Sequence, residues 1–185
     1  MNKIKRLVAM MLAVIMSVTV LPQTQIKAST GTASLVNIGQ LGTVNIGDKS
    51  ESGTWLKTLV NNKSVFCLDL GKACHSGDVY VSSTSEISSD STNAKTAAKA
   101  KIGHWYAFTK NKTNKAWVYA QCLIWSAEEG RTSESQLKDV IKQVRNNTGY
   151  YNDKTVNEIY NQIFNIDHTV ICSISKWTSS AYSRQ

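Results

Sequence analysis

Short hydrophobic segments separated by glycines fill the N-terminal third of the chain. Residues 33–39, 41–47 and 53–60 ("ASLVNIG", "LGTVNIG" and "GTWLKTLV") have the length and residue types of β-strands. Glycine favours turns, so we expect the chain to reverse between these segments. The near repeat of "VNIG" at 36–39 and 44–47 predicts that the first two segments form a β-hairpin.

A further apolar segment contains the first cysteine. Residues 63–70, "KSVFCLDL", predict another strand, with Cys67 on it or at its end. The chain then becomes polar over residues 71–93, where "GKACHSGD" is followed by "SSTSEISSDSTN". This composition favours a loop over packed structure.

Helical patterns begin after this polar stretch. Residues 94–108 are rich in alanine and predict a helix. Residues 113–130, "TNKAWVYAQCLIWSAEEG", predict the strongest helix of the chain, with Asn114 able to cap its start and Gly130 able to close its end. Its Trp117, Gln121 and Trp125 share one broad face because they are spaced four residues apart. A glutamine therefore lies among tryptophans.

Two more helices open with capping boxes. Ser133 and Gln136 begin the segment 133–144, in which apolar residues recur at helical spacing. Thr155 and Glu158 begin a shorter helix in the same way.

The last segment returns to strand patterning. Val170, Cys172 and Ile174 alternate with polar residues, as on a half-buried strand. Strands in the N-terminal part and at the C-terminus, around a helical segment, predict an α+β fold in a single domain.

The N-terminus has the pattern of a secretory signal peptide. Three basic residues within positions 1–6 precede the apolar run 7–21, which is shorter than the ~20 residues of a membrane-spanning helix. Pro22 and the small residue Ala28 follow, and we expect cleavage after Ala28. The mature domain is then 29–185, which is exported and has no membrane span.

Charge and cysteine count narrow the function further. Removing residues 1–28 takes away four basic residues and no acidic ones, so the formal net charge falls from +8 to +4. This small positive net charge, in a sequence without runs of basic residues, gives no reason to expect a nucleic-acid partner. Four cysteines permit two disulfides but do not require them. No C-x-x-C pair is present to suggest zinc, and we expect neither a metal nor a cofactor.

Cys67 has two ordinary interpretations. It can be a catalytic nucleophile of a cysteine hydrolase, with His75 or His104 as the base. It can also be a structural residue, buried or bridged to Cys74, Cys122 or Cys172, in a secreted domain that binds its partner noncovalently.

Two stretches support a more specific hypothesis. Phe66, Cys67 and Leu68 form an aromatic-Cys-aliphatic triplet, and "AQCLIW" at 120–125 includes Gln121 and Trp125. Together they resemble the thioester domains of Gram-positive surface adhesins, which carry such a triplet and a helix with Thr-Gln-x-Ala-aliphatic-Trp. Here alanine stands in the threonine position and leucine in the small alanine position.

The family's third motif is a late glutamine, which the resemblance places at Gln185. In that family the cysteine and this glutamine are joined as an internal thioester, so the resemblance implies a Cys67–Gln185 pair with Gln121 and Trp125 in support. Arg184 stands where the family has an apolar neighbour. Gln121 is a rival for the acyl position because it lies in a well-formed predicted helix.

The resemblance also implies what the domain does. A lysine amine on a host extracellular protein attacks the glutamine carbonyl, the cysteine thiolate departs, and an isopeptide link remains. The event occurs once per molecule, so the domain is a reactive binding module and not an enzyme. His75 or His104 is a candidate to deprotonate the incoming ammonium.

The resemblance bears on location and assembly as well. We expect a monomer that is secreted or displayed on the cell surface. No anchor signal is recognisable in the sequence, and we expect it to be a portion of a longer adhesin that continues past Gln185.

Overall fold

Five strands and four helices make up the described part of the protein. The computed structural model describes residues 30–68, 70, 74–108 and 113–179. The elements along the chain are β1 (Thr30–Ile46), β2 (Lys49–Val60), β3 (Lys63–Ser64), β4 (Val79–Ser88), α2 (Ala94–Phe108), α3 (Asn114–Glu128), α4 (Glu134–Thr148), α5 (Val156–Phe164) and β5 (Ile171–Ser179). The strands form one antiparallel sheet in the order β3-β2-β1-β4-β5. This confirms the α+β, single-domain prediction.

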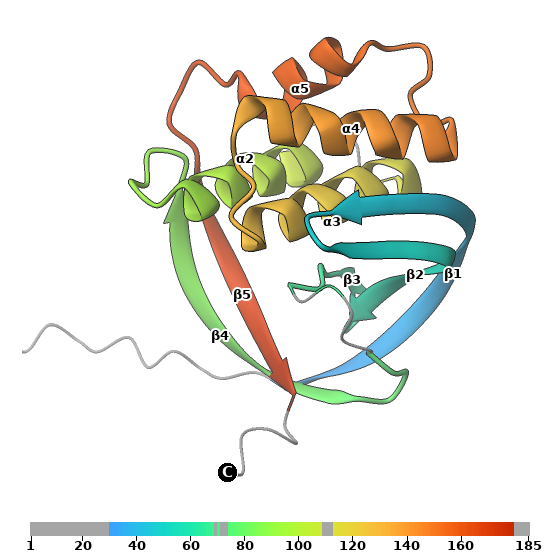
Figure 1. Ribbon diagram of the computed structural model, residues 1–185. Helices are drawn as coiled ribbons and strands as arrows, with labels where there is room; N and C mark the ends of the chain where they lie inside the picture. Colours follow the sequence, from blue (N-terminus) through green and yellow to red (C-terminus); the bar gives the residue numbers. More distant parts are fainter. Residues whose placement is uncertain (1–29, 69, 71–73, 109–112, 180–185) are drawn as a thin grey trace, which may run out of the picture.

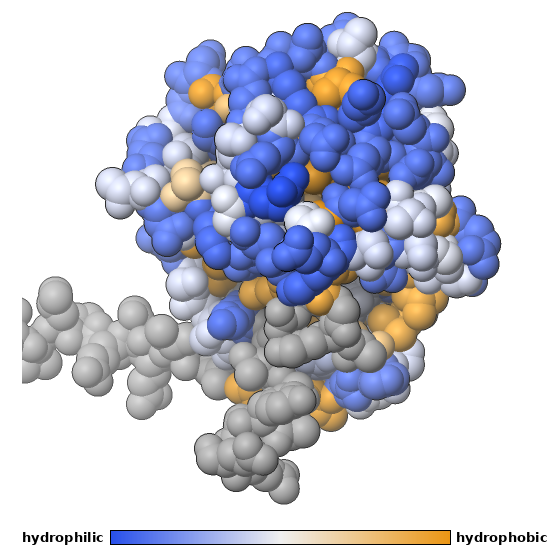
Figure 2. All heavy atoms as spheres, in the orientation of Figure 1, coloured by the Kyte–Doolittle hydropathy of each residue, from blue (hydrophilic) through white to orange (hydrophobic). Residues whose placement is uncertain are grey.

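The helices gather at one end of the curved sheet (Figure 1). Helix α3 packs between α2 and α4 and against β1. The β4–β5 ladder runs away from the helices to the start of β1, where Thr30–Thr32 pair with Val79–Val81. In Figure 2, hydrophilic residues cover most of the helical end of the molecule.

The predicted hairpin of the two "VNIG" segments is wrong, because both lie on the single strand β1. The first glycine, Gly39, has φ +116° and accompanies a register shift in the pairing of β1 with β2. Such a β-bulge bends a strand without ending it. The second, Gly47, has φ +61° and makes the reversal into β2, where Ile46 pairs with Lys49. A positive φ at the first of two turn residues suits the twist of a hairpin.

Two predictions between residues 63 and 93 are also wrong. The strand predicted over 63–70 stops at Ser64, so Cys67 lies three residues beyond β3. The loop predicted over 71–93 contains the ten-residue strand β4. Residues 80–88 of β4 pair with β5 at every position, so main-chain hydrogen bonding holds a Ser/Thr-rich strand that packs few side chains.

The helix predictions are confirmed, with one change of cap. Thr113 caps α3 by accepting a hydrogen bond from the Ala116 N–H, and Asn114 is the first helical residue. Gly130 ends the turn with φ +76°. All residues from Ala116 to Ala127 are buried, so α3 is the centre of the core.

Helices α4 and α5 follow their capping boxes. In both, the N-cap side chain accepts from the N3 backbone and the N3 side chain accepts from the N-cap backbone. Gly149 closes α4 with φ 66°. Leu137, Val140, Ile141 and Val144 give α4 its buried stripe, and α5 buries Ile159 and Ile163.

The final strand and the cysteines complete the fold. Val170 is buried, and Cys172 and Ile174 are half-buried, in agreement with the predicted alternation. All four cysteines belong to the described residues, and no disulfide joins them. No helix in the described ranges has the length and apolar character needed to cross a membrane.

Candidate functional site

The segment Val65, Phe66 and Cys67 lies against α3 and is held there by side chains. The Trp117 Nε1–H donates to the Val65 carbonyl at 3.1 Å. One turn later, the Gln121 carboxamide makes two hydrogen bonds with Cys67: its Oε1 accepts from the Cys67 N–H at 2.9 Å, and its Nε2 donates to the Cys67 carbonyl at 2.8 Å. Trp117 and Gln121 are four residues apart, so they lie on one face of α3 and both bind the segment.

Gln121 takes the place of a neighbouring strand. Just beyond the β2–β3 ladder, the Val65 N–H donates to the Thr58 carbonyl at 3.1 Å. In an antiparallel ladder, one residue exchanges both an N–H and a C=O with its partner. Cys67 makes this exchange with a side chain, which explains why strand structure ends before the cysteine. Gln121 is only 1% exposed, and the two bonds satisfy an amide that would be costly to bury alone.

Phe66 anchors the same segment through aromatic packing. Its ring stacks on Trp117 with centroids 6.1 Å apart, and it meets Tyr106 of α2 edge-on at 5.1 Å. Both partner rings are buried. The residue before the cysteine is therefore fixed by two helices.

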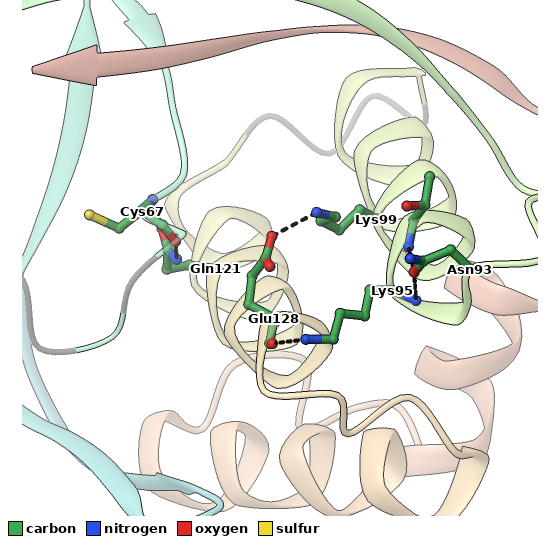
Figure 3. A network of polar contacts seen from close by, with 7 residues as sticks. Cys67, Asn93, Lys95, Lys99, Gln121 and Glu128 are labelled. Atoms are coloured by element: carbon green, nitrogen blue, oxygen red, sulfur yellow. Dashed lines mark hydrogen bonds and ion pairs between the residues drawn. The ribbon is translucent and has the colours of Figure 1, made fainter. Parts of the chain in front are cut away.

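The Cys67 thiol points away from Gln121 (Figure 3). The residue is half-buried and packs against the main hydrophobic core. The Gln121 carboxamide is engaged with the main chain of Cys67. Fixing the main chain while leaving the side chain to project is a way to orient a reactive group.

Trp125 lies one turn beyond Gln121, as the sequence predicts for a supporting residue. Its ring packs against Trp55 of β2, with centroids 5.9 Å apart and planes tilted by 56°. Trp55 is 3% exposed and Trp125 is 8% exposed. Within the described part of the chain, neither indole N–H has a hydrogen-bond partner.

His75 lies in the segment between Cys67 and β4. Its ring is largely exposed, with Nδ1 3.7 Å from the Asp78 carboxylate, and its backbone N–H donates to the same carboxylate at 2.9 Å. The Tyr80 hydroxyl donates to the Cys74 sulfur at 3.2 Å. The pKa of Tyr80 lies well above its ordinary value. Burial is the largest cause, and smaller contributions come from this hydrogen bond and from the charges of Cys74, Asp78 and Cys67. Tyr80 therefore stays neutral at physiological pH.

The remaining candidates lie elsewhere. His104 of α2 meets His168 edge-on, with ring centroids 5.9 Å apart. Cys122 is fully buried on α3, and burial raises the pKa of its thiol well above the ordinary value. The Cys172 thiol donates to the Ala100 carbonyl at 3.6 Å, and burial raises its pKa as well. Cysteines that stay protonated are poor nucleophiles.

Gln185 lies outside the described residues. Ser179, the last residue of β5, pairs with Tyr80.

Sequence reasoning located the Cys67 triplet and the Gln121–Trp125 helix, but it missed three contributors. These are Trp55, Tyr80 and Tyr106, which come from β2, β4 and α2. Each is an aromatic residue in an apolar or strand-like segment, and no spacing within the sequence distinguishes it from an ordinary core residue. No group of three or more potential metal ligands occurs among the described residues. Comparison of the chain with protein-family models, curated proteins and solved structures gives no match.

Proposed function

We propose that this protein is a thioester-type adhesin domain in which Cys67 forms an internal thioester with Gln185. The thioester reacts once with a lysine amine on a host extracellular protein and leaves an isopeptide link. In this proposal the domain is exported through the signal sequence 1–28, acts in secreted or surface-displayed form as a monomer, and needs no cofactor.

The observation that carries the proposal is the double hydrogen bond from the buried Gln121 carboxamide to the main chain of Cys67. Together with Trp117 and Phe66, this contact fixes the position of a half-buried thiol that projects away from Gln121. Holding a nucleophile in place can raise its effective concentration by orders of magnitude.

In this proposal the two glutamines have different roles. The Gln121 carboxamide already binds both polar groups of the Cys67 main chain, and the sulfur projects away from it. This contact supports Gln121 as the positioning residue, and Gln185 as the acyl donor follows from the proposed thioester. Trp125 supports the apolar wall that keeps water from the thioester.

The chemistry needs no outside reagent to form the bond. The Cys67 thiolate attacks the side-chain carboxamide carbon of Gln185, the C–N bond breaks, and ammonia leaves with the thiol proton. A partner amine then attacks the same carbon, and the C–S bond breaks to restore the thiol. The exposed His75, paired with Asp78, is available to take a proton from the incoming ammonium.

Intact mass of the purified protein tests the proposal. Wild type should be lighter than its sequence by one ammonia, and methylamine should convert it to a methylamine adduct. Cys67→Ala should show the full sequence mass. Peptide mapping should then place methylamine on Gln185; a modified Gln121 would reverse the roles assigned above.

Other masses would point to other functions. A wild-type mass equal to the sequence mass contradicts the thioester and favours a secreted domain that binds noncovalently. Loss of hydrogen atoms alone would indicate disulfides. Repeated cleavage of a peptide substrate would indicate a hydrolase.

A further inference from the structure

Two adjacent indole donors in the core lack an acceptor. Trp55 and Trp125 pack ring against ring, and each has more than nine tenths of its surface buried. Neither Nε1–H finds a hydrogen-bond partner among the described residues. Burying a donor without an acceptor costs free energy, so two neighbouring cases call for a physical explanation.

The elements that carry both donors converge on Cys67. Trp125 follows Gln121 by one turn on the same side of α3, and Gln121 binds the Cys67 main chain. On β2, Thr58 accepts from the N–H of Val65, two residues before Cys67, and Trp55 lies three residues from Thr58 on the same strand. Cys67 also packs against the core cluster that contains both tryptophans.

Other buried donors in this core do have acceptors. The Trp117 Nε1–H, on the same helix, donates to the Val65 carbonyl at 3.1 Å. The Tyr119 hydroxyl donates to the Tyr150 carbonyl at 2.7 Å. Burial in this core therefore does not by itself leave a side-chain donor without an acceptor.

We propose that the indole N–H groups of Trp55 and Trp125 form a subsite for the oxygen of an acyl group carried by Cys67. The identity of that acyl group as the Gln185 side chain rests on the proposed function, whereas the subsite itself does not. The ligand class is a carbonyl oxygen attached to the cysteine sulfur.

The two indole donors would stabilise negative charge during the reaction. When sulfur or an amine attacks the acyl carbon, the carbonyl oxygen gains negative charge in the tetrahedral intermediate. Donors that already point at this oxygen, in surroundings that exclude water, stabilise the charge without reorganising. The charge is lost again when the C–N or C–S bond breaks, so both formation and aminolysis of the thioester benefit.

Replacing one indole by its sulfur isostere tests the proposal. Trp55 or Trp125 is exchanged for 3-benzothienylalanine, which keeps the ring shape and lacks the N–H. We expect aminolysis by methylamine to slow by about 10²-fold for each donor removed. The melting temperature should hold or rise, because an unsatisfied donor is lost.

Trp117 provides the matched contrast. The same isostere there leaves the Val65 carbonyl without its donor, so the melting temperature should fall. An unchanged aminolysis rate in both the Trp55 and the Trp125 variants would overturn the subsite. A slower rate with an unchanged or higher melting temperature cannot come from lost stability and supports it.

An NMR experiment separates failure of the subsite from failure of the proposed function. Phenyl thioacetate transfers its acetyl group to a cysteine thiol and releases thiophenol, so it can acylate Cys67 without Gln185. The indole signals of ¹⁵N-tryptophan-labelled Gln185→Ala protein, which cannot form the proposed thioester, are compared before and after acetylation, with Cys67→Ala as the control for acetylation elsewhere.

We expect the Trp55 and Trp125 indole protons to move downfield only when Cys67 carries an acyl group. If wild type shows no ammonia loss but acetylation shifts both signals, the proposed function fails and the subsite stands. The subsite is overturned if the two indole signals do not shift on acetylation. It is also overturned if they already lie downfield in Cys67→Ala, because water would then occupy the position of the acyl oxygen.

Discussion

Two glutamines of this protein make the same contact in different surroundings. Gln121 of α3 accepts from the N–H of Cys67 and donates to its carbonyl, and Gln143 of α4 does the same with Asn45 of β1, at 2.8 and 3.2 Å. Gln121 is buried, whereas Gln143 is half-buried and Asn45 is exposed. The shared geometry shows that a carboxamide can stand in for a strand, and the difference lies in whether water can replace it.

The largest expected effect is that of Gln121→Ala. It leaves the Cys67 N–H and carbonyl without partners beside the core, so we expect a loss of about 3 kcal/mol in the free energy of unfolding. Misplacement of the cysteine should also reduce the fraction of molecules that lose ammonia. Urea unfolding and intact mass measure the two effects.

The matched control is Gln143→Ala. Because water reaches Asn45, we expect a loss of less than about 1 kcal/mol and full ammonia loss. Equal destabilisation by the two substitutions would show that burial does not distinguish the contacts.

Trp117→Phe sharpens the comparison, because it loosens Val65 and leaves the Gln121 contact in place. Loss of the bond to the Val65 carbonyl should cost about 1–2 kcal/mol, measured by urea unfolding. Tyr119→Phe is the control, since it also removes one hydrogen bond from α3, to Tyr150. We expect only Trp117→Phe to lower the yield of thioester. A similar yield in both variants would confine positioning to Gln121.

The smallest expected effect comes from a fully exposed side chain that accepts a main-chain hydrogen bond. The Glu158 carboxylate accepts from the Thr155 N–H at 2.6 Å, and this bond, followed by the one from the Thr155 hydroxyl, lowers the pKa of Glu158 below 4.5. Its contribution to stability is therefore present above pH 4.5 and is lost as the pH falls through the lowered pKa. Glu158→Gln should flatten this part of a stability-versus-pH curve, and an unaltered slope would contradict the assignment.

The sequence predicted the elements whose stability is local. Ser133 with Gln136, and Thr155 with Glu158, specify helix starts within four residues, and both capping boxes are present. Gly47 and Gly39 look alike in sequence, yet one makes a turn and the other a bulge. Which one reverses the chain depends on pairing with β2, and a local pattern does not contain that pairing.

The candidate site was only partly predictable for the same reason. Cys67, Gln121 and Trp125 were found through short motifs, but the end of the strand before Cys67 results from competition between β2 and Gln121, which is 54 residues away. Trp55 and Trp125 come together only through packing between β2 and α3. Strand β4 was missed because its Ser/Thr-rich sequence is held by main-chain pairing with β5.

The two hydrogen bonds between Gln121 and Cys67 are made to main-chain atoms of residue 67. These two bonds therefore fix where this side chain starts, whichever side chain it is. The main-chain contact at position 67 does not depend on the residue type. Serine, selenocysteine or a synthetic reactive group could therefore be introduced there while the contact with Gln121 is kept.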